Sequence, residues 1–397
     1  PQPQILMKER LCILILAFAA FLTGSCIYPF TPEIEDLDLG LFVIEGDIRI
    51  GTESYIFVRN TQRLTATGSP VDIMADVWVE NDKGEITRAS NYRDGAHIID
   101  TRNLDPRASY RLHVKPYSGM GYSASPGYNT EYVTDWLEVL VTPEIEEVSF
   151  RVDELEEKIT FHVSTTNPAA NPYYKWNCNE VWEYTSQFYA SHVFNPNRNT
   201  VEESPNENRH YCWDRDVVPD IMIASTDALS ENRLVNHQIY QLPFASDKLD
   251  YLYSIEVIQS SISAEAYIYW EVMLRNTYQP GGLFSPQPSE LRGNIHCVGD
   301  STKVVLGYIS ASKVTSRRIF VSVNDFPMQN RRENCSAFIE INLAEESKMR
   351  RYYFGGYDVV FLDEMTSITS WSERRCVDCR VKGGTKDKPD YWPNNHN

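Results

Sequence analysis

The sequence has few basic residues relative to its acidic ones. Of its 397 residues, 37 are Lys or Arg and 55 are Asp or Glu, which gives a formal net charge of −18 at pH 7. The chain carries no basic stripe, and we expect no nucleic-acid partner, because such binding depends on neutralising phosphates. The hydrophobic fraction of 42% is ordinary for a globular protein, which excludes wholesale disorder and a membrane protein with many spans.

Common catalytic motifs are missing as well. The sequence contains no GxSxG, no HExxH and no Walker loop. Residues 119–124 fit GxGxxA, but Pro126 prevents the helix that this motif needs, so we interpret the segment as a turn. Composition does not exclude a glycosidase-like carboxylate pair, although Glu144, Glu146 and Glu147 are expected in solvent at a strand edge. We predict no catalytic residues, no cofactor and no metal.

The apolar run over residues 11–22 is too short to cross a membrane. Its 12 residues would span about 18 Å as a helix, whereas the bilayer core is about 30 Å thick. Lys8 and Arg10 precede the run and small residues follow it, a pattern typical of a secretory signal peptide. We therefore predict a signal peptide over residues 1–25, with Met7 as the expected start of translation.

The end of this signal resembles a bacterial lipobox. Small residues at 23–25 lead to Cys26, which would be diacylated and become the mature N-terminus. The leucine usual three places before the cysteine stands four places before it, at Leu22, and an ordinary signal with an incidental cysteine is the alternative. Acyl chains that bury about 0.8 kcal/mol per CH₂ would anchor the protein durably. We predict lipidation at Cys26 and a tether over residues 26–40.

Besides Cys12 and Cys26, the chain has an even set of cysteines: Cys178, Cys212, Cys297, Cys335, Cys376 and Cys379. An even number in an exported protein favours disulfides, although sequence alone does not choose their pairing. We predict a Cys178–Cys212 bond, because both residues flank one polar loop, and such a bond would contribute roughly 3–4 kcal/mol. The other four are expected to attach the C-terminal segment. For the CxxC pair Cys376 and Cys379, structural disulfides are favoured over a redox or zinc site, since no second ligand pair exists.

Residues 41–141 predict an immunoglobulin-like β-sandwich. Short runs rich in Val, Ile, Phe and Tyr alternate with turn signals. Tyr110 opens a strand after a turn, as in the tyrosine corner of such sandwiches. Along that strand Leu112 shares its face with Tyr110, whereas His113 lies on the opposite face. His97 and His113 are expected to be solvated strand residues rather than ligands.

Residues 142–397 predict a second, larger β-rich domain. Alternating apolar residues continue, and one helix is expected over residues 264–276, with Ser263 as its cap. The segment 178–212 is expected to be a long loop, for which a binding role and a mobile surface loop both stay open. The predicted fold class is therefore mostly β, with two sandwich-like domains, one helix and a C-terminal tail held by disulfides.

A series of C-terminal segments resembles a family of Bacteroidota outer-membrane lipoproteins, domain of unknown function 4249. These segments are residues 263–270, 281–288, 292–295, 305–311, 376–385 and 388–392, together with the opening 26–34. The resemblance covers nearly the whole mature chain, most strongly residues 250–393. It implies an outer-membrane lipoprotein of a kind commonly encoded beside TonB-dependent, SusC-like transporters. It supplies no catalytic residues.

The C-terminal motif has two interpretations. Glycines 383 and 384 permit a positive-φ turn, and the residues after them could hold the tail on the sandwich. Its cations either pair with nearby acids or form a docking surface for a barrel or an anionic ligand. The docking candidates are Arg380, Gly383, Gly384, Lys388, Pro389, Tyr391 and Trp392.

The sequence and the resemblance together predict a non-catalytic, lipid-anchored outer-membrane protein at the cell surface, with a periplasmic orientation as the alternative. Its expected partner is a TonB-dependent barrel, which it would serve as an accessory or ligand-capture subunit. The ligand would be an unidentified small molecule or an oligomer. A structural subunit of an outer-membrane complex, a surface adhesin and a secreted hydrolase are the competing hypotheses.

Overall fold

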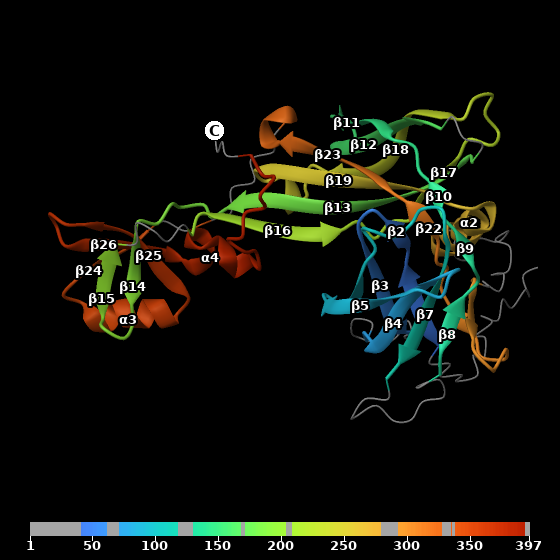
Figure 1. The fold of residues 1–397 in the computed structure, drawn as a ribbon. Helices are drawn as coiled ribbons and strands as arrows, with labels where there is room; N and C mark the ends of the chain where they lie inside the picture. The colour runs from blue at the N-terminus through green and yellow to red at the C-terminus, as the bar shows by residue number, and fades with distance from the viewer. Residues whose placement is uncertain are drawn as a thin grey trace, which may run out of the picture. The chain divides into compact units, whose positions relative to one another are not determined.

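A computed structural model describes residues 41–61, 71–117, 130–167, 171–203, 209–278, 293–327, 335 and 338–393 (Figure 1). The predicted signal peptide, Cys26, the tether and the turn at 119–124 lie outside the described residues. Most of the described chain is β-strand, as the sequence predicts. Within it, no helix is both long enough and apolar enough to span a membrane.

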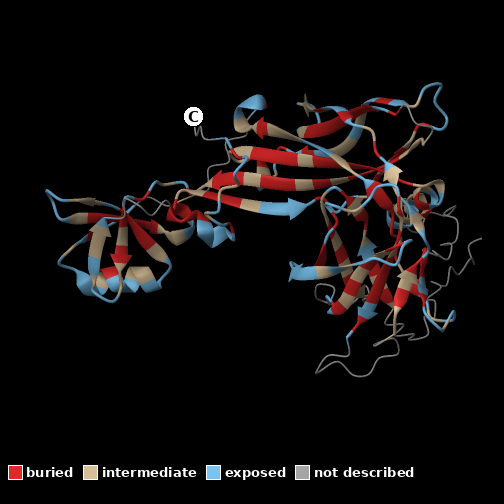
Figure 2. Ribbon diagram, viewed as in Figure 1, coloured by how far each residue is buried: buried red, intermediate tan, exposed pale blue. Residues whose placement is uncertain are grey.

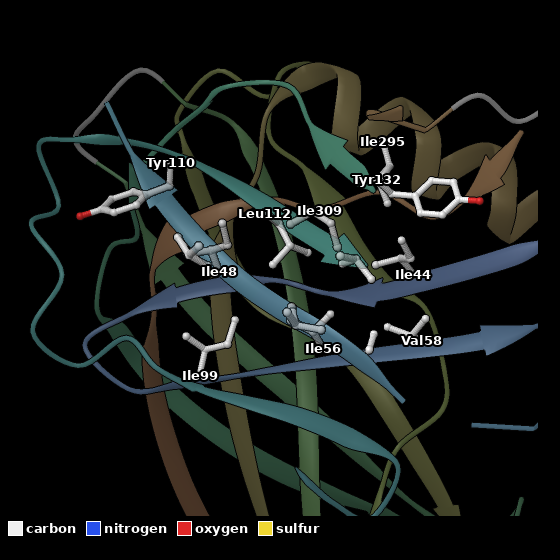
Figure 3. Packing of buried hydrophobic residues seen from close by; sticks show 14 of the residues in the cluster. Ile44, Ile48, Ile56, Val58, Ile99, Tyr110, Leu112, Tyr132, Ile295 and Ile309 are labelled. Carbon is white, nitrogen blue, oxygen red and sulfur yellow. The ribbon is translucent and has the colours of Figure 1, made fainter. Parts of the chain in front are cut away.

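The first group of strands encloses one hydrophobic core. These strands are β1 (Phe42–Gly46), β2 (Ile48–Ile50), β3 (Glu53–Asn60), β4 (Ala75–Asn81), β5 (Ile86–Arg93), β6 (Ala96–Asp100), β7 (Ser109–Pro116), β8 (Tyr132–Thr134), β9 (Leu137–Glu138) and β10 (Leu140–Val141). Strand β5 pairs with β4 at its start and with β6 further along, so the chain passes from one layer to the other. Ile44, Ile56 and Leu112 meet between the layers (Figure 3). The result is a β-sandwich.

The predicted tyrosine corner is confirmed. Tyr110 is buried, and its hydroxyl donates a 2.9 Å hydrogen bond to the carbonyl oxygen of Asp105. This contact ties the turn before β7 to the strand itself, which is the arrangement found in immunoglobulin-like sandwiches.

Later residues complete this first sandwich. Strand β20 (Ile295–Cys297) pairs with β8, β21 (Val305–Leu306) pairs with β1, and β22 (Ala311–Lys313) lies between β2 and β10. Ile309 and Ala311 belong to its core. The structure therefore differs from the predicted boundary at residue 141, because sequence periodicity carries no information about which distant strands pair.

The second sandwich has two facing sheets. One contains β11 (Ile145–Asp153), β12 (Lys158–Thr166) and β18 (Arg233–Pro243); the other contains β13 (Tyr173–Thr185), β16 (Tyr211–Val217), β17 (Met222–Ser225), β19 (Leu252–Ser261) and β23 (Thr315–Ser322). Buried residues run along the centres of β13 and β19 (Figure 2). Phe161, Trp176 and Tyr253 form part of the shared core. Two 3₁₀ helices flank these strands, η1 (Asp247–Leu249) and η2 (Val323–Asp325).

A small C-terminal module follows. It contains β24 (Ile339–Asn342), β25 (Tyr357–Asp363), β26 (Ile368–Glu373), α3 (Glu346–Phe354), α4 (Arg374–Val377) and the 3₁₀ helix η3 (Cys379–Lys382). The hairpin of β14 (His192–Asn195) and β15 (Thr200–Glu203) adds Phe194 to its core. The prediction of a long loop over residues 178–212 is therefore wrong. Strand β13 extends to Thr185, and the hairpin packs against residues some 150 positions away in sequence, which a local pattern does not reveal.

The predicted helix is confirmed as α2 (Ala264–Tyr278). The Ser263 side chain accepts a hydrogen bond from the Ala266 amide at 3.2 Å, as expected of an N-cap residue. Ala266 and Tyr269 are buried. The prediction of a single helix is wrong, however, since α3 and α4 are helical too. Helix α3 has only 9 residues and α4 only 4, so each offers too few turns for a periodic pattern to be recognised in the sequence.

Candidate functional site

The disulfides attach and cross-link the C-terminal module, and they do not close the loop predicted over residues 178–212. Cys212 on β16 bonds to Cys379, and Cys335 bonds to Cys376. The predicted Cys178–Cys212 bond is wrong. The residue opposite Cys212 on β13 is Tyr184, six positions from Cys178 and so about 20 Å along the strand, whereas a disulfide needs Cα atoms within about 7 Å.

Two cysteines predicted as disulfide candidates are free thiols within the described structure. Cys178 and Cys297 are both buried. The sulfur of Cys178 lies 3.9 Å from that of Met222, and burial raises the pKa of the Cys178 thiol far above its usual range. A thiol in this environment stays protonated and packs as a small apolar group.

The prediction that both cysteines of the CxxC motif form structural disulfides is confirmed. Cys376 and Cys379 do not bond to each other; each is buried and bonds to a distant cysteine. The Cys379 bond spans 167 residues and fixes the end of the chain to the second sandwich.

The tail after the CxxC motif packs on the second sandwich, as one of the two interpretations predicts. Trp392 is buried against Val181 and Trp213, and its indole nitrogen donates a 2.7 Å hydrogen bond to Glu183 Oε2. Thr385 exchanges two backbone hydrogen bonds of 2.8 Å with Trp213. The tail therefore continues the edge of the sheet beyond β16.

The other motif residues support this tail. Gly383 has φ of 101°, which is the predicted positive-φ turn. The Trp392 amide donates to the carbonyl oxygen of Pro389 at 2.9 Å, and the Lys388 amide donates to that of Lys386 at 2.9 Å. Tyr391 is partly exposed, and the Arg318 guanidinium lies over its ring, 4.0 Å from the ring centroid. These contacts close a compact turn on the sheet.

The basic residues of the motif pair locally. Arg380 makes two hydrogen bonds to Asp378, of 2.8 and 2.6 Å. Burial disfavours the charged form of Asp378, but the Arg380 hydrogen bonds outweigh burial and lower its pKa. Arg375 pairs with Glu373 at 2.6 Å. These contacts favour the pairing interpretation over an open cationic docking surface.

Gly384 provides a direct test of the packed tail. A Cβ atom added there would lie 2.1 Å from the Tyr184 hydroxyl oxygen, which now accepts a 2.8 Å hydrogen bond from the Gly384 amide. We expect Gly384→Ala to lower the free energy of unfolding by about 1–3 kcal/mol, because overpacking forces the tail to shift. Chemical denaturation measures this change. In a Tyr184→Phe background the loss should be smaller, and an equal loss in both backgrounds would contradict the contact.

A second group of side chains, which sequence reasoning missed, lies on the outer face of the first sandwich. We call it the aromatic face; it comprises Trp78, Glu80, Arg88, Arg111, His113, Glu131 and Trp136. Strand alternation creates it: Ala75, Val77 and Val79 of β4 point into the core, so the residues between them point outward.

His113 lies at the centre of the aromatic face. Its ring nitrogens lie 2.7 Å from Glu131 Oε1 and 2.9 Å from Glu80 Oε2. Glu80 also accepts two hydrogen bonds from Arg111, which lower its pKa, with a smaller contribution from His113. The charged side chains are thus held in fixed positions.

Aromatic rings complete the face. Trp78 stacks on His113, with ring centroids 4.8 Å apart. The Arg88 guanidinium lies over the Trp78 ring, 4.9 Å from its centroid. Beside this stack, the Arg111 guanidinium lies 4.6 Å from the ring centroid of Trp136, a residue that is 47% exposed. The face therefore presents a tryptophan and guanidinium groups to solvent in fixed positions.

The expectation that both strand histidines are solvated is wrong. His113 is buried by the contacts described above. His97 is buried as well, with Nε2 3.1 Å from the Ile73 carbonyl oxygen, and burial lowers its pKa.

The expectation that Glu144, Glu146 and Glu147 are exposed is confirmed. Among the described residues, no cluster of three or more His, Cys, Asp or Glu side chains is arranged to hold a metal ion.

Only part of the aromatic face was visible in the sequence. Alternation places Arg111 and His113 on one side of β7, but Glu80 and Trp78 are more than 30 positions earlier. The register that sets Trp78 opposite His113 is needed to bring them together. The outward tryptophan on the earlier strand was a further available signal.

The described chain is thus a protein of two β-sandwiches carrying a small disulfide-bonded module. Residues 27–318 match the model of a protein family described as "Domain of unknown function (DUF4249)", and the chain belongs to this family. The matched range starts one residue after Cys26 and ends before the CxxC motif and the tail. No curated protein matches the chain.

Proposed function

We propose that this protein is an exported, lipid-anchored protein of the outer membrane that serves a TonB-dependent transporter as a non-catalytic accessory or ligand-capture subunit. The observation that carries the proposal is the aromatic face, an ordered and solvent-accessible group of tryptophan and arginine side chains. These two residue types dominate the energetics of protein interfaces.

Export is supported by two independent features. The first is the signal-like N-terminus ending at Cys26. The second is the pair of disulfides, since such bonds persist mainly in oxidising compartments. A diacylated Cys26 would hold the sandwiches at a membrane surface, where a barrel partner is accessible.

The geometry of the aromatic face favours binding. Glu80 and Glu131 hold Arg111 and His113 by hydrogen bonds, so these side chains have little rotamer freedom left to lose on association. Trp136 offers one ring face to Arg111 and keeps nearly half of its surface exposed. Such an arrangement is suited to a protein partner or a ligand with planar or charged groups.

Co-purification tests the proposal. A tagged chain is isolated from detergent-solubilised outer membranes, and the proteins that accompany it are identified by mass spectrometry. We expect a TonB-dependent barrel in stoichiometric amount. Recovery without any barrel would contradict the proposal and favour an adhesin or a free-standing binder, whereas a barrel-bound protein that binds no ligand would be a structural subunit.

The aromatic face gives a quantitative prediction for the same experiment. Trp136→Ala should weaken barrel association about tenfold or more, because an exposed tryptophan packed against an arginine is a typical hot spot. The matched control is Phe354→Ala, which removes an aromatic side chain 68% exposed on α3 of the C-terminal module. Equal retention of the barrel by both variants and the parent protein would exclude the aromatic face as the interface.

A further inference from the structure

A buried polar region lies where the first sandwich contacts the second. Strands β2 and β22 contribute residues from one side, and β13 and β19 from the other. Figure 1 shows β2 and β22 near α2, and one end of β13 and of β19 extending toward them. We call this region the polar seam; it comprises Asp47, Arg49, Lys175, Ser260, Ser310 and Ser312.

Strand register places these side chains on facing surfaces. On β2, Ile48 and Ile50 point into the first core, so Asp47 and Arg49 point the other way. Ser312 pairs with Arg49 and therefore shares its face.

The opposite surface follows the same rule. On β13, Trp176 belongs to the core of the second sandwich, so Lys175 points away from that core. Ser260 of β19 is directly opposite Lys175. The hydrogen bond from Lys175 Nζ to Asp47 Oδ2, 2.9 Å long, joins the two surfaces.

The charges of the seam do not balance. Lys175 and Asp47 are both more than nine-tenths buried and neutralise each other, and Asp47 Oδ1 also accepts from the Ser310 amide. Arg49, which is partly exposed, donates to the neutral Asn177 side chain at 3.2 Å and has no carboxylate partner within the described chain. The seam thus holds two cations and one anion, which leaves one positive charge.

Several buried donors in the seam also lack a partner. In the part of the chain that the structure describes, no acceptor lies within hydrogen-bond reach of the Arg49 Nε–H or of the hydroxyls of Ser260, Ser310 and Ser312. The same holds for the indole N–H of Trp270, whose ring lies 4.2 Å from Lys175 Nζ. Buried polar groups are rarely left unpaired in native proteins, and an accumulation of donors in one region points to an acceptor from outside the chain.

We propose that the polar seam binds a small monovalent anion, of the chemical class of chloride and bromide. Such an ion accepts hydrogen bonds from hydroxyl, indole and guanidinium donors alike, and its charge cancels the excess positive charge. By contacting residues of both sandwiches, the bound ion stabilises their junction. This inference does not depend on the association with a transporter.

Halide-dependent unfolding of the purified mature chain tests the proposal. At constant ionic strength, sodium bromide replaces sodium gluconate, whose anion is much larger than a halide. The Tm should rise by about 2 °C for each tenfold increase in bromide above the dissociation constant, because the ligand binds only the folded state. A Ser260→Ala/Ser312→Ala variant should lose most of this dependence.

A matched control separates the seam from general salt effects. Ser372→Ala also removes a buried hydroxyl without a partner in the described chain, but in the C-terminal module, and should keep the full bromide response. Crystals grown in bromide provide a readout that needs no variant. An anomalous peak beside Ser260 and Arg49 would support the proposal, whereas ordered water without bromide, or equal bromide responses in all variants, would overturn it.

Discussion

Replacing Arg209 with methionine is expected to lower the free energy of unfolding by about 3–5 kcal/mol at pH 7. Arg209 is almost completely buried; it donates to Asp358 Oδ2 at 2.8 Å and to the His192 carbonyl oxygen at 2.6 Å. These contacts join the β14–β15 hairpin to β25. Removing the guanidinium leaves a buried carboxylate without its counter-ion, which is more damaging than the loss of an exposed ion pair.

The effect should depend on pH in a defined direction. Burial raises the pKa of Asp358, and Arg209 counteracts that increase. In Arg209→Met the pKa of Asp358 rises further above its unfolded value of about 3.9, so the folded state binds the proton more tightly than the unfolded state. The loss of stability should therefore be smallest near pH 4 and grow as the pH rises through the raised pKa.

Chemical denaturation between pH 4 and pH 8 measures this dependence. The matched variant is Arg209→Met/Asp358→Asn, in which no charge remains to be buried. It should recover part of the lost stability at pH 7 and show little of the additional pH dependence. If the single and double variants lose the same free energy at every pH, the carboxylate is not the source of the effect.

Loss of the Cys212–Cys379 bond is expected to cost about 2–5 kcal/mol. The bond closes a loop of 167 residues, four times the 41 residues that separate Cys335 from Cys376, so it restricts the unfolded chain more. It also holds η3 against β16, next to the hydrogen bond from the Tyr184 hydroxyl to the Cys379 carbonyl oxygen. Without it the tail residues, including Trp392, lose a covalent attachment.

The double variant Cys212→Ala/Cys379→Ala measures this contribution without leaving an unpaired thiol. Thermal unfolding under non-reducing conditions should show a clear decrease in Tm, and the tail should become accessible to proteases. Cys297→Ala removes a buried but unbonded thiol and should cost only about 1 kcal/mol. A double variant no less stable than Cys297→Ala would show that the bond does not hold the tail.

Local features of the fold were predictable from the sequence. Tyr110 and its turn lie within a few residues of each other, and α2 combines a serine cap with a regular apolar stripe. The signals for the Tyr110 turn and for α2 each lie within a short stretch of sequence. The packing of the Trp392 tail was also foreseen, since a glycine turn followed by aromatic residues needs a surface to cover.

Features that depend on distant pairing were not predictable. The bonding partner of Cys212 is set by the β13–β16 register and by a tail 167 residues away. His113 is buried because β4 places Trp78 and Glu80 beside it, and because Glu131, just before β8, contacts it from the other side. Alternation within one strand gives the face of a residue, but it does not give the neighbouring strand.

The central claim is that the chain is exported, lipid-anchored and disulfide-bonded. The mass of the intact protein extracted from outer membranes tests this claim most directly. We expect a polypeptide that begins at Cys26, carries the mass of a diacylglyceryl group, and lacks two hydrogens for each of the two disulfides. A mature chain without lipid, or one cleaved elsewhere, would contradict the anchor, and a fully reduced chain would contradict export into an oxidising compartment.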